Sequence, residues 1–208
     1  NAGMFPMRVR TGDLPALAKF PAAPFGIIEL NDDATLPITV RNVEADLNVR
    51  ALVAGQSATA STLRLNDDAA VVRWQRRLAE YHERDIEVGQ TRGRVPQPVY
   101  AQSRALSVFE GEGAGAVTPQ RIVLPRSADE RRPFEVIGLP LSEPGFHVVE
   151  VASRLLGREL LARDAPMYVR TGALVTNLAV HFKQGRENAL VWVTTLDRAE
   201  PVAGAQVR

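Results

Sequence analysis

The sequence predicts a mainly β protein: an antiparallel β-sandwich with one inserted α-helix, followed by the first strands of a second β domain. Apolar and polar residues alternate in many short segments, and turn-forming residues separate these segments. Only one stretch has helical periodicity, which is too few helices for a parallel sheet with crossover helices. Strands joined by short turns are typical of two sheets packed face to face.

The clearest early strand is residues 36–43, where Leu36, Ile38 and Val40 fall on one face. Residues 167–171 are either the last strand of the first domain or the lead into the next one. The other strands expected before residue 172 are residues 47–53, 99–109 with 120–124 pairing back to it, 134–141 and 145–153.

The segment before residue 31 is expected to run along a sheet edge. Pro15, Pro21 and Pro24 each lack a backbone donor and fix φ, so they exclude a central strand or a helix. The large apolar residues between and after these prolines are the expected anchors of the segment: Phe20, Phe25, Ile27 and Ile28.

One amphipathic helix is predicted at about residues 67–84, with Asn66 as its N-cap. Its large apolar residues recur at spacings of 3, 4 and 3 and therefore share one face: Val71, Trp74, Leu78 and Tyr81. We expect this face to pack on its own domain as an insertion that covers a sheet edge or face. An exposed Trp74 would instead indicate an interdomain contact.

The last stretch, residues 174–207, contains two more alternating runs on either side of a polar loop with Gly185. A third short run follows at residues 201–207. Because the alternation continues up to Arg208, we expect this stretch to begin a further domain. The predicted division is a first domain at residues 3–170 and the start of a second at residues 171–208.

The composition of the chain excludes several classes of function. Charged residues make up 24% of the chain and the net charge is +1, which gives no field that would attract nucleic acid. No apolar run approaches the roughly 18 residues of a membrane helix, so we expect no direct membrane insertion. The absence of cysteine excludes disulfides, thiolate metal sites and a cysteine nucleophile from these residues.

The sequence indicates no catalytic, cofactor-binding or metal-binding residue. His82, His147 and His181 lack the spacings of a metal site, and each is expected on a solvated helix or strand surface. No nucleophile-elbow motif supports a catalytic triad. The glycines at 111, 113 and 115 lack the lysine of a phosphate loop and predict a hairpin tip instead. We therefore expect a protein that is not an enzyme.

Three segments, taken in order, resemble the bacterial α2-macroglobulins. They are residues 10–20 with 23–27, residues 133–141 with 143–150, and residues 167–205, which end in the Pro-Val-Ala-Gly-Ala run at 201–205. Members of this family are strings of macroglobulin-like β-sandwiches, an architecture similar to fibronectin type III domains. The resemblance implies a fragment from the amino-terminal half of such a protein.

The resemblance also implies a function. The chain would be a structural domain of a broad-spectrum protease trap and not catalytic by itself. Its partners would be neighbouring macroglobulin domains and, through the full-length protein, target proteases. The family is periplasmic, and many members are anchored by a lipidated amino-terminal cysteine. Its reactive thioester needs a cysteine, so these residues do not carry it.

Two other functions stay open at this point. A free-standing extracytoplasmic adhesion or ligand-binding β-sandwich would need an exposed aromatic platform or a convergent polar pocket. A β-rich enzyme would need His147 or His181 to cluster with acidic residues.

Overall fold

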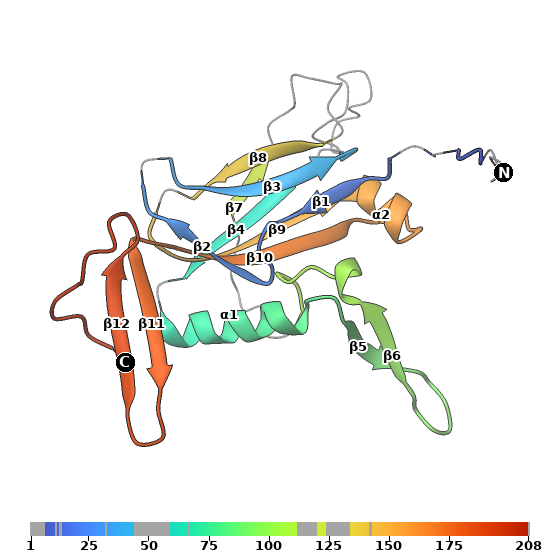
Figure 1. The fold of residues 1–208 in the computed structure, drawn as a ribbon. Helices are drawn as coiled ribbons and strands as arrows, with labels where there is room; N and C mark the ends of the chain where they lie inside the picture. The colour runs from blue at the N-terminus through green and yellow to red at the C-terminus, as the bar shows by residue number, and fades with distance from the viewer. Residues whose placement is uncertain are drawn as a thin grey trace, which may run out of the picture.

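The structure is a computed structural model of the chain. It describes residues 7–10, 12, 14–31, 33–43, 59–65, 67–111, 120–123, 134–141 and 143–207. Two β-sheets face each other, and a helix lies on the outer side of the larger sheet (Figure 1). The mainly β, sandwich-type fold with an added helix is therefore confirmed. The strand expected at residues 47–53 lies outside the described residues.

The smaller sheet has three antiparallel strands in the order β1-β3-β8. Its inward side is apolar because alternate residues of β3, including Leu36, Ile38 and Val40, are buried as the sequence pattern predicts. The strands are β1 (Leu17–Lys19), β3 (Thr35–Arg41) and β8 (Glu135–Pro140).

The larger sheet has five strands in the order β2-β10-β9-β4-β7. β10 pairs antiparallel with β9 and parallel with β2, a parallel pair that the sequence does not predict. The ambiguous segment that begins at Met167 is thus the start of a central strand. The strands are β2 (Phe25–Glu29), β10 (Met167–Thr176), β9 (Gly145–Ser153), β4 (Thr59–Leu65) and β7 (Gln120–Val123).

The proline-rich amino-terminal segment crosses from one sheet to the other, with β1 and β2 each at a sheet edge. This confirms the expected edge position. Between them, Phe20 is buried in the core that fills the space between the sheets. The rest of that core comes mainly from β3, β8, β9 and β10 and includes Ile38, Leu139, Val149, Val151, Ala173 and Val175.

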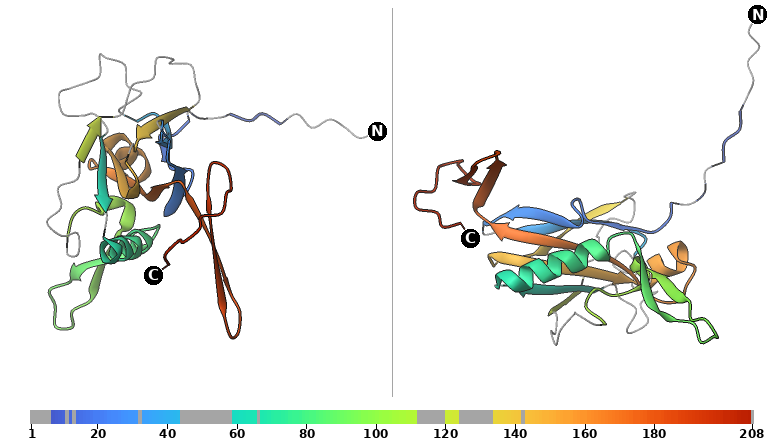
Figure 2. Two further views of the ribbon diagram at one scale, coloured as in Figure 1. Left: turned by 90° about the vertical axis from the view of Figure 1, so that its left-hand side faces the viewer. Right: turned by 90° about the horizontal axis from the view of Figure 1, so that it is seen from below.

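Helix α1 (Asp68–Glu80) covers the outer face of the larger sheet, as both views in Figure 2 show. Trp74 and Leu78 pack with Phe146 and Val148 of β9 in a second apolar cluster, so the helix face contacts its own domain as expected. The helix is shorter than residues 67–84, because Tyr81 caps it and Glu83 has a positive φ. Asp67 takes the capping role predicted for Asn66, since its carboxylate accepts from Ala70 N–H at 2.8 Å.

The prediction of a strand at residues 99–109 is wrong in the length of the strand and in its pairing partner. β5 (Asp85–Gln90) and β6 (Pro98–Gln102) form their own two-stranded sheet, and the 3-10 helix Ser103–Ala105 follows. β7 pairs with β4 instead. The apolar residues that suggested a strand form a loop whose Val108 is buried against α1, which explains their pattern.

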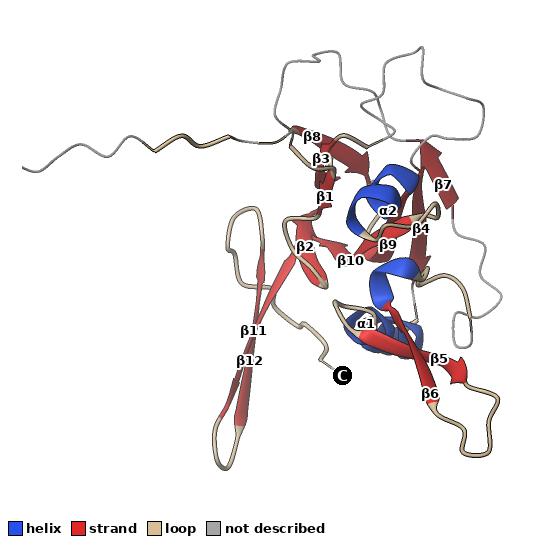
Figure 3. Cartoon of the chain, turned by 90° about the vertical axis from the view of Figure 1, so that its right-hand side faces the viewer, coloured by secondary structure: helices blue, strands red, loops and turns tan. Residues whose placement is uncertain are grey.

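β11 (Leu178–Gln184) and β12 (Ala189–Thr195) form a hairpin that projects from the sandwich (Figures 1 and 3). Within the described residues, the run at 201–207 contributes only an isolated bridge between Thr194 and Pro201, not a strand. β10 continues past residue 170 to Thr176 and belongs to the sandwich along its length. The division into domains at residues 170 and 171 stays a prediction.

Helix α2 (Arg154–Leu160) connects β9 to β10 and is capped by the Ser153 hydroxyl, which accepts from Leu156 N–H at 3.1 Å. Its Glu159 carboxylate accepts from Ala16 N–H at 2.6 Å and so links the helix to the segment before β1. Neither helix has the length and hydropathy needed to span a membrane, nor does any other helix in the described ranges.

Gly157 of α2 allows this connection to pack closely. A Cβ at this position would lie 1.8 Å from the Ala165 carbonyl oxygen, which is backbone and has little freedom to move. We expect Gly157→Ala to lower the free energy of unfolding by roughly 1–3 kcal/mol in urea denaturation. Gly93→Ala is the control, since its nearest neighbour would be 3.7 Å away. Equal effects of the two substitutions would contradict the packing argument.

Candidate functional site

A buried ion pair lies at the centre of the larger sheet. Glu150 of β9 and Arg170 of β10 stand directly opposite each other, on the side of the sheet that faces α1. Their side chains are 3% and 5% exposed, and Arg170 Nε lies 3.2 Å from Glu150 Oε2. Sequence reasoning assigned neither residue a role, although a charged residue within each apolar strand was a visible signal.

The Glu150 carboxylate is fully engaged. It accepts a hydrogen bond from the Ser107 hydroxyl and another from Val108 N–H at 2.8 Å, in addition to the ion pair. Burial raises the pKa of Glu150, while the Arg170 guanidinium and these two donors oppose the shift. Its oxygens are occupied by structural donors, so this arrangement does not provide a free general base.

The Arg170 guanidinium ties irregular segments to the sheet. It donates to the carbonyl oxygens of Tyr81 at 3.3 Å, Ser103 at 3.1 Å and Leu106 at 2.8 Å. The guanidinium carbon also lies 5.4 Å from the centre of the Tyr81 ring. The end of α1 and the loop after β6 are therefore held to β10 by one side chain.

Arg77 of α1 extends the network outward. Its Nε donates to the Val108 carbonyl at 2.6 Å, and its guanidinium carbon lies 4.7 Å from the centre of the Tyr81 ring. It also donates to the Glu110 carbonyl. Two arginines thus fix the same loop from opposite sides, one from the helix and one from the sheet.

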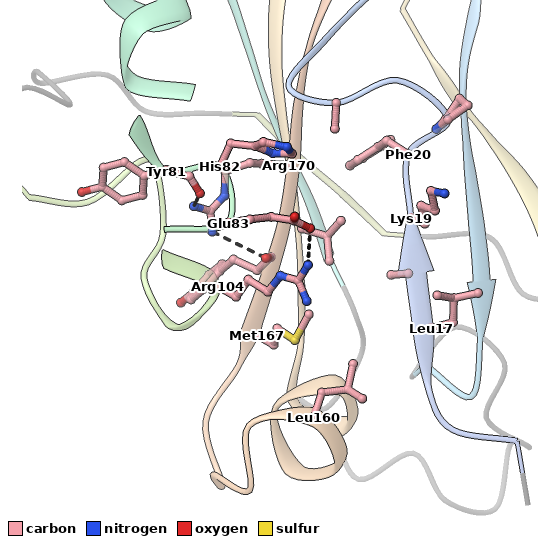
Figure 4. A pocket seen from close by; sticks show the side chains of 15 residues that line it. Leu17, Lys19, Phe20, Tyr81, His82, Glu83, Arg104, Leu160, Met167 and Arg170 are labelled. Carbon is pink, nitrogen blue, oxygen red and sulfur yellow. Dashed lines mark hydrogen bonds and ion pairs between the residues drawn. The ribbon is translucent and has the colours of Figure 1, made fainter. Parts of the chain in front are cut away.

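A pocket of about 480 Å³ adjoins the ion pair, between the segment around β1 and the first half of β10 (Figure 4). Phe20 and Met167 give it apolar walls, and Arg170 forms part of its lining. Glu83 and Arg104 form an ion pair with each other there. The guanidinium groups of Arg104 and Arg170 thus already have carboxylate partners, which leaves less charge to bind an ionic ligand.

The histidines occupy three different environments. His82 lines the pocket, and His181 is exposed on β11. His147 is 6% exposed, so its expected position on a solvated strand surface is wrong. Its Nε2 lies 2.8 Å from the Glu143 carbonyl oxygen, a partner that compensates the burial. Within the described part of the chain, no three His, Cys, Asp or Glu residues form a group that could hold a metal ion.

The β11–β12 hairpin projects from the sandwich in Figure 1, and many of its exposed side chains are apolar. Leu178, Val180 and Phe182 are 45%, 63% and 64% exposed. The register places them on one face with Val191 and Val193 of β12. A sandwich strand normally buries such a face in a core, whereas here the face is largely exposed.

We expect loss of either partner of the buried ion pair to destabilise the fold strongly. Arg170→Leu leaves the Glu150 carboxylate buried without its counter-charge, and should cost roughly 3–5 kcal/mol in urea denaturation. The double variant Glu150→Leu/Arg170→Leu should be more stable than Arg170→Leu alone, because no unpaired charge remains.

An exposed ion pair is the control for these Glu150 and Arg170 variants. Arg158 Nε lies 2.8 Å from Asp164 Oδ1, and these side chains are 47% and 71% exposed. Asp164→Asn should therefore cost about 1 kcal/mol or less. A comparable loss in Asp164→Asn and Arg170→Leu would contradict the central role of the buried pair.

His147 should make the fold sensitive to acid. Burial lowers its pKa from the ordinary value of 6.5, and the nearby Arg64 acts in the same direction. Between the folded and unfolded pKa values the unfolded chain binds more protons, so stability falls as the pH drops below about 6.5. His147→Gln should reduce this dependence in urea denaturation between pH 7 and 5. His181→Gln, an exposed control, should leave it unchanged.

Comparisons with known proteins bear mainly on the hairpin. A family model described as the bacterial alpha-2-macroglobulin MG3 domain matches residues 175–208. A crystal structure of native alpha-2-macroglobulin from Escherichia coli, spanning domains MG0-NIE-MG1, is 12% identical with a TM-score of 0.44. The alignment covers 93% of this chain and 50% of that one, so the chain spans about half its length. No curated protein matches the chain.

Proposed function

We propose that this chain, a fragment of a bacterial alpha-2-macroglobulin family protein, is a structural module of a protease trap. The observation that carries the proposal is the match of residues 175–208 to the family's MG3 domain. The sandwich before it is then a preceding domain in the same polypeptide. Its role is to hold the following domain in place, and proteases are bound by the whole protein.

The connection between the two parts supports a scaffold role. β10 is a central strand of the sandwich up to Thr176, and β11 begins at Leu178, so Asn177 alone separates them. Asn177 also accepts from Leu196 N–H at 2.9 Å and from Asp197 N–H at 3.3 Å. Because this linker is short and hydrogen-bonded, it fixes the orientation of the following domain relative to the sandwich.

The chemistry of the sandwich is consistent with a protein that does not catalyse. Glu150 and Arg170 are buried, and they form hydrogen bonds with loops of the same domain. His147 is bonded to the Glu143 carbonyl. These groups stabilise the fold, and Glu83, which lines the pocket together with His82, is paired with Arg104.

We further propose a periplasmic location for the full-length protein, as the family resemblance implies. The alternative function, a free-standing extracytoplasmic adhesion or ligand-binding sandwich, would have to use the pocket of about 480 Å³. The pairing of Glu83 with Arg104 at that pocket favours the scaffold role instead.

The isolated chain should neither inhibit nor hydrolyse. Incubated with proteases of several classes, the 208-residue chain should leave their activity unchanged, whereas the full-length protein should reduce cleavage of large protein substrates. The structural reason is that the described Glu150, Arg170 and His147 are engaged within the fold, and that the pocket of about 480 Å³ is far too small to enclose a protease. Circular dichroism on the same sample checks that the chain is folded. Stoichiometric inhibition by the isolated chain would overturn the scaffold proposal.

A further inference from the structure

An apolar groove lies between the first turns of α1 and the neighbouring ends of β4, β9 and β10 in the larger sheet, and β2 borders it beside β10. Its volume is about 540 Å³, and Val71, Val72 and Leu174 are among its lining residues. Ile27 stands beside Leu174 on the neighbouring strand and is 56% exposed, and Val72 is 46% exposed. Contiguous exposed apolar surface of this kind marks a contact site rather than a solvated face.

The groove is bordered by an aromatic stack. Phe25 of β2 lies 5.9 Å from Phe146 of β9, ring centre to ring centre, and Phe25 is still 39% exposed. Phe146 also lines the groove. The edge of the sheet therefore presents a rigid aromatic side to whatever covers it, which lowers the entropic cost of binding there.

The next domain is held close to this groove by its connection. α1 starts at the end of the sheet where β10 leaves it, and the hairpin projects from that same end in Figure 1. Leu30 N–H, directly after β2, donates to the Thr176 carbonyl at 3.0 Å, so hydrogen bonds join this segment to β10 up to the linker. With one intervening residue, Asn177, the following domain is held next to this end of the sandwich.

The hairpin carries large apolar side chains about as far from Asn177 as the groove residue Leu174 is on the other side. Leu174 precedes Asn177 by three residues, roughly 10 Å along a strand, and Trp192 is level with His181, four residues or roughly 13 Å beyond it. Trp192 and Leu190 are 50% and 58% exposed and lie on the face opposite Val180 and Phe182. A domain that uses the Phe182 face for its own core leaves Trp192 and Leu190 available to a neighbour.

We propose that this groove docks the second domain of the same polypeptide, the domain that β11 and β12 begin, with Trp192 and Leu190 as its anchors. Tryptophan is enriched at the buried centres of protein interfaces, and the groove offers the apolar surroundings it needs. This inference rests on the proposed function, because it requires that the hairpin belongs to a further domain. It gives α1 a role beyond covering its own sheet, since its Val71 and Val72 form one wall of the interface.

Hydrogen exchange of the full-length protein and of the 208-residue chain tests this docking. Peptides covering residues 25–30 and 68–76 should exchange about 5-fold more slowly or better in the full-length protein, because docking adds a coupling between the domains. Peptides from the β5–β6 sheet, which lies beyond the other end of α1 in Figure 1, should exchange equally in both.

Ile27→Asp and Trp192→Ala in the full-length protein should each remove the added protection. Val136→Asp is the matched control for Ile27→Asp, because Val136 is 57% exposed on β8 of the other sheet. The control should retain the protection. Equal exchange of residues 25–30 and 68–76 in both proteins would overturn the docking proposal, as would protection that survives Ile27→Asp.

The same measurement separates this inference from the proposed function. If residues 178–195 gain protection in the full-length protein but the groove does not, the hairpin belongs to a larger domain that does not dock there. If residues 178–195 gain none, the hairpin is not part of a further folded domain, and the proposed function fails as well.

Discussion

The Glu150–Arg170 pair joins parts of the chain that regular secondary structure leaves unconnected. Two neighbouring strands bring the charges together, and burial would make each charge costly if its hydrogen bonds were missing. The loop after β6 and the end of α1 provide those bonds through Val108 N–H and three carbonyl groups. The inserted helix, the loop and the sheet are therefore interdependent, since the ion pair is tolerable only when all three are in place.

Several strands of the sandwich and the hairpin were predictable because they follow local rules, whereas β4 (Thr59–Leu65) was not among the expected strands. Alternation located β3, β8, β9, β11 and β12, and prolines explained why the amino-terminal segment stays at sheet edges. The predicted end of α1 was less accurate than these strands. Helical periodicity continues through Tyr81, but the positive φ of Glu83 and the pull of Arg170 on the Tyr81 carbonyl direct the chain elsewhere.

The buried network was not predictable, for a physical reason. Three of the acceptors of Arg170 lie 64 to 89 positions earlier in the sequence, and they are backbone carbonyls, which no residue type identifies. For the same reason Val108 suggested a strand although it is buried in a loop beneath α1. His147 was misjudged because β9 is buried on both faces, so its alternation did not separate inside from outside.

The single residue between β10 and β11 also decides how the two parts share mechanical load. A pull on the hairpin acts along β10, whose backbone hydrogen bonds to β9 run across the direction of the strand. Such bonds are loaded together in shear rather than broken one after another, and β2 adds a second row on the other side. Movement of the hairpin would thus be resisted by the whole five-stranded sheet instead of being absorbed by a flexible linker.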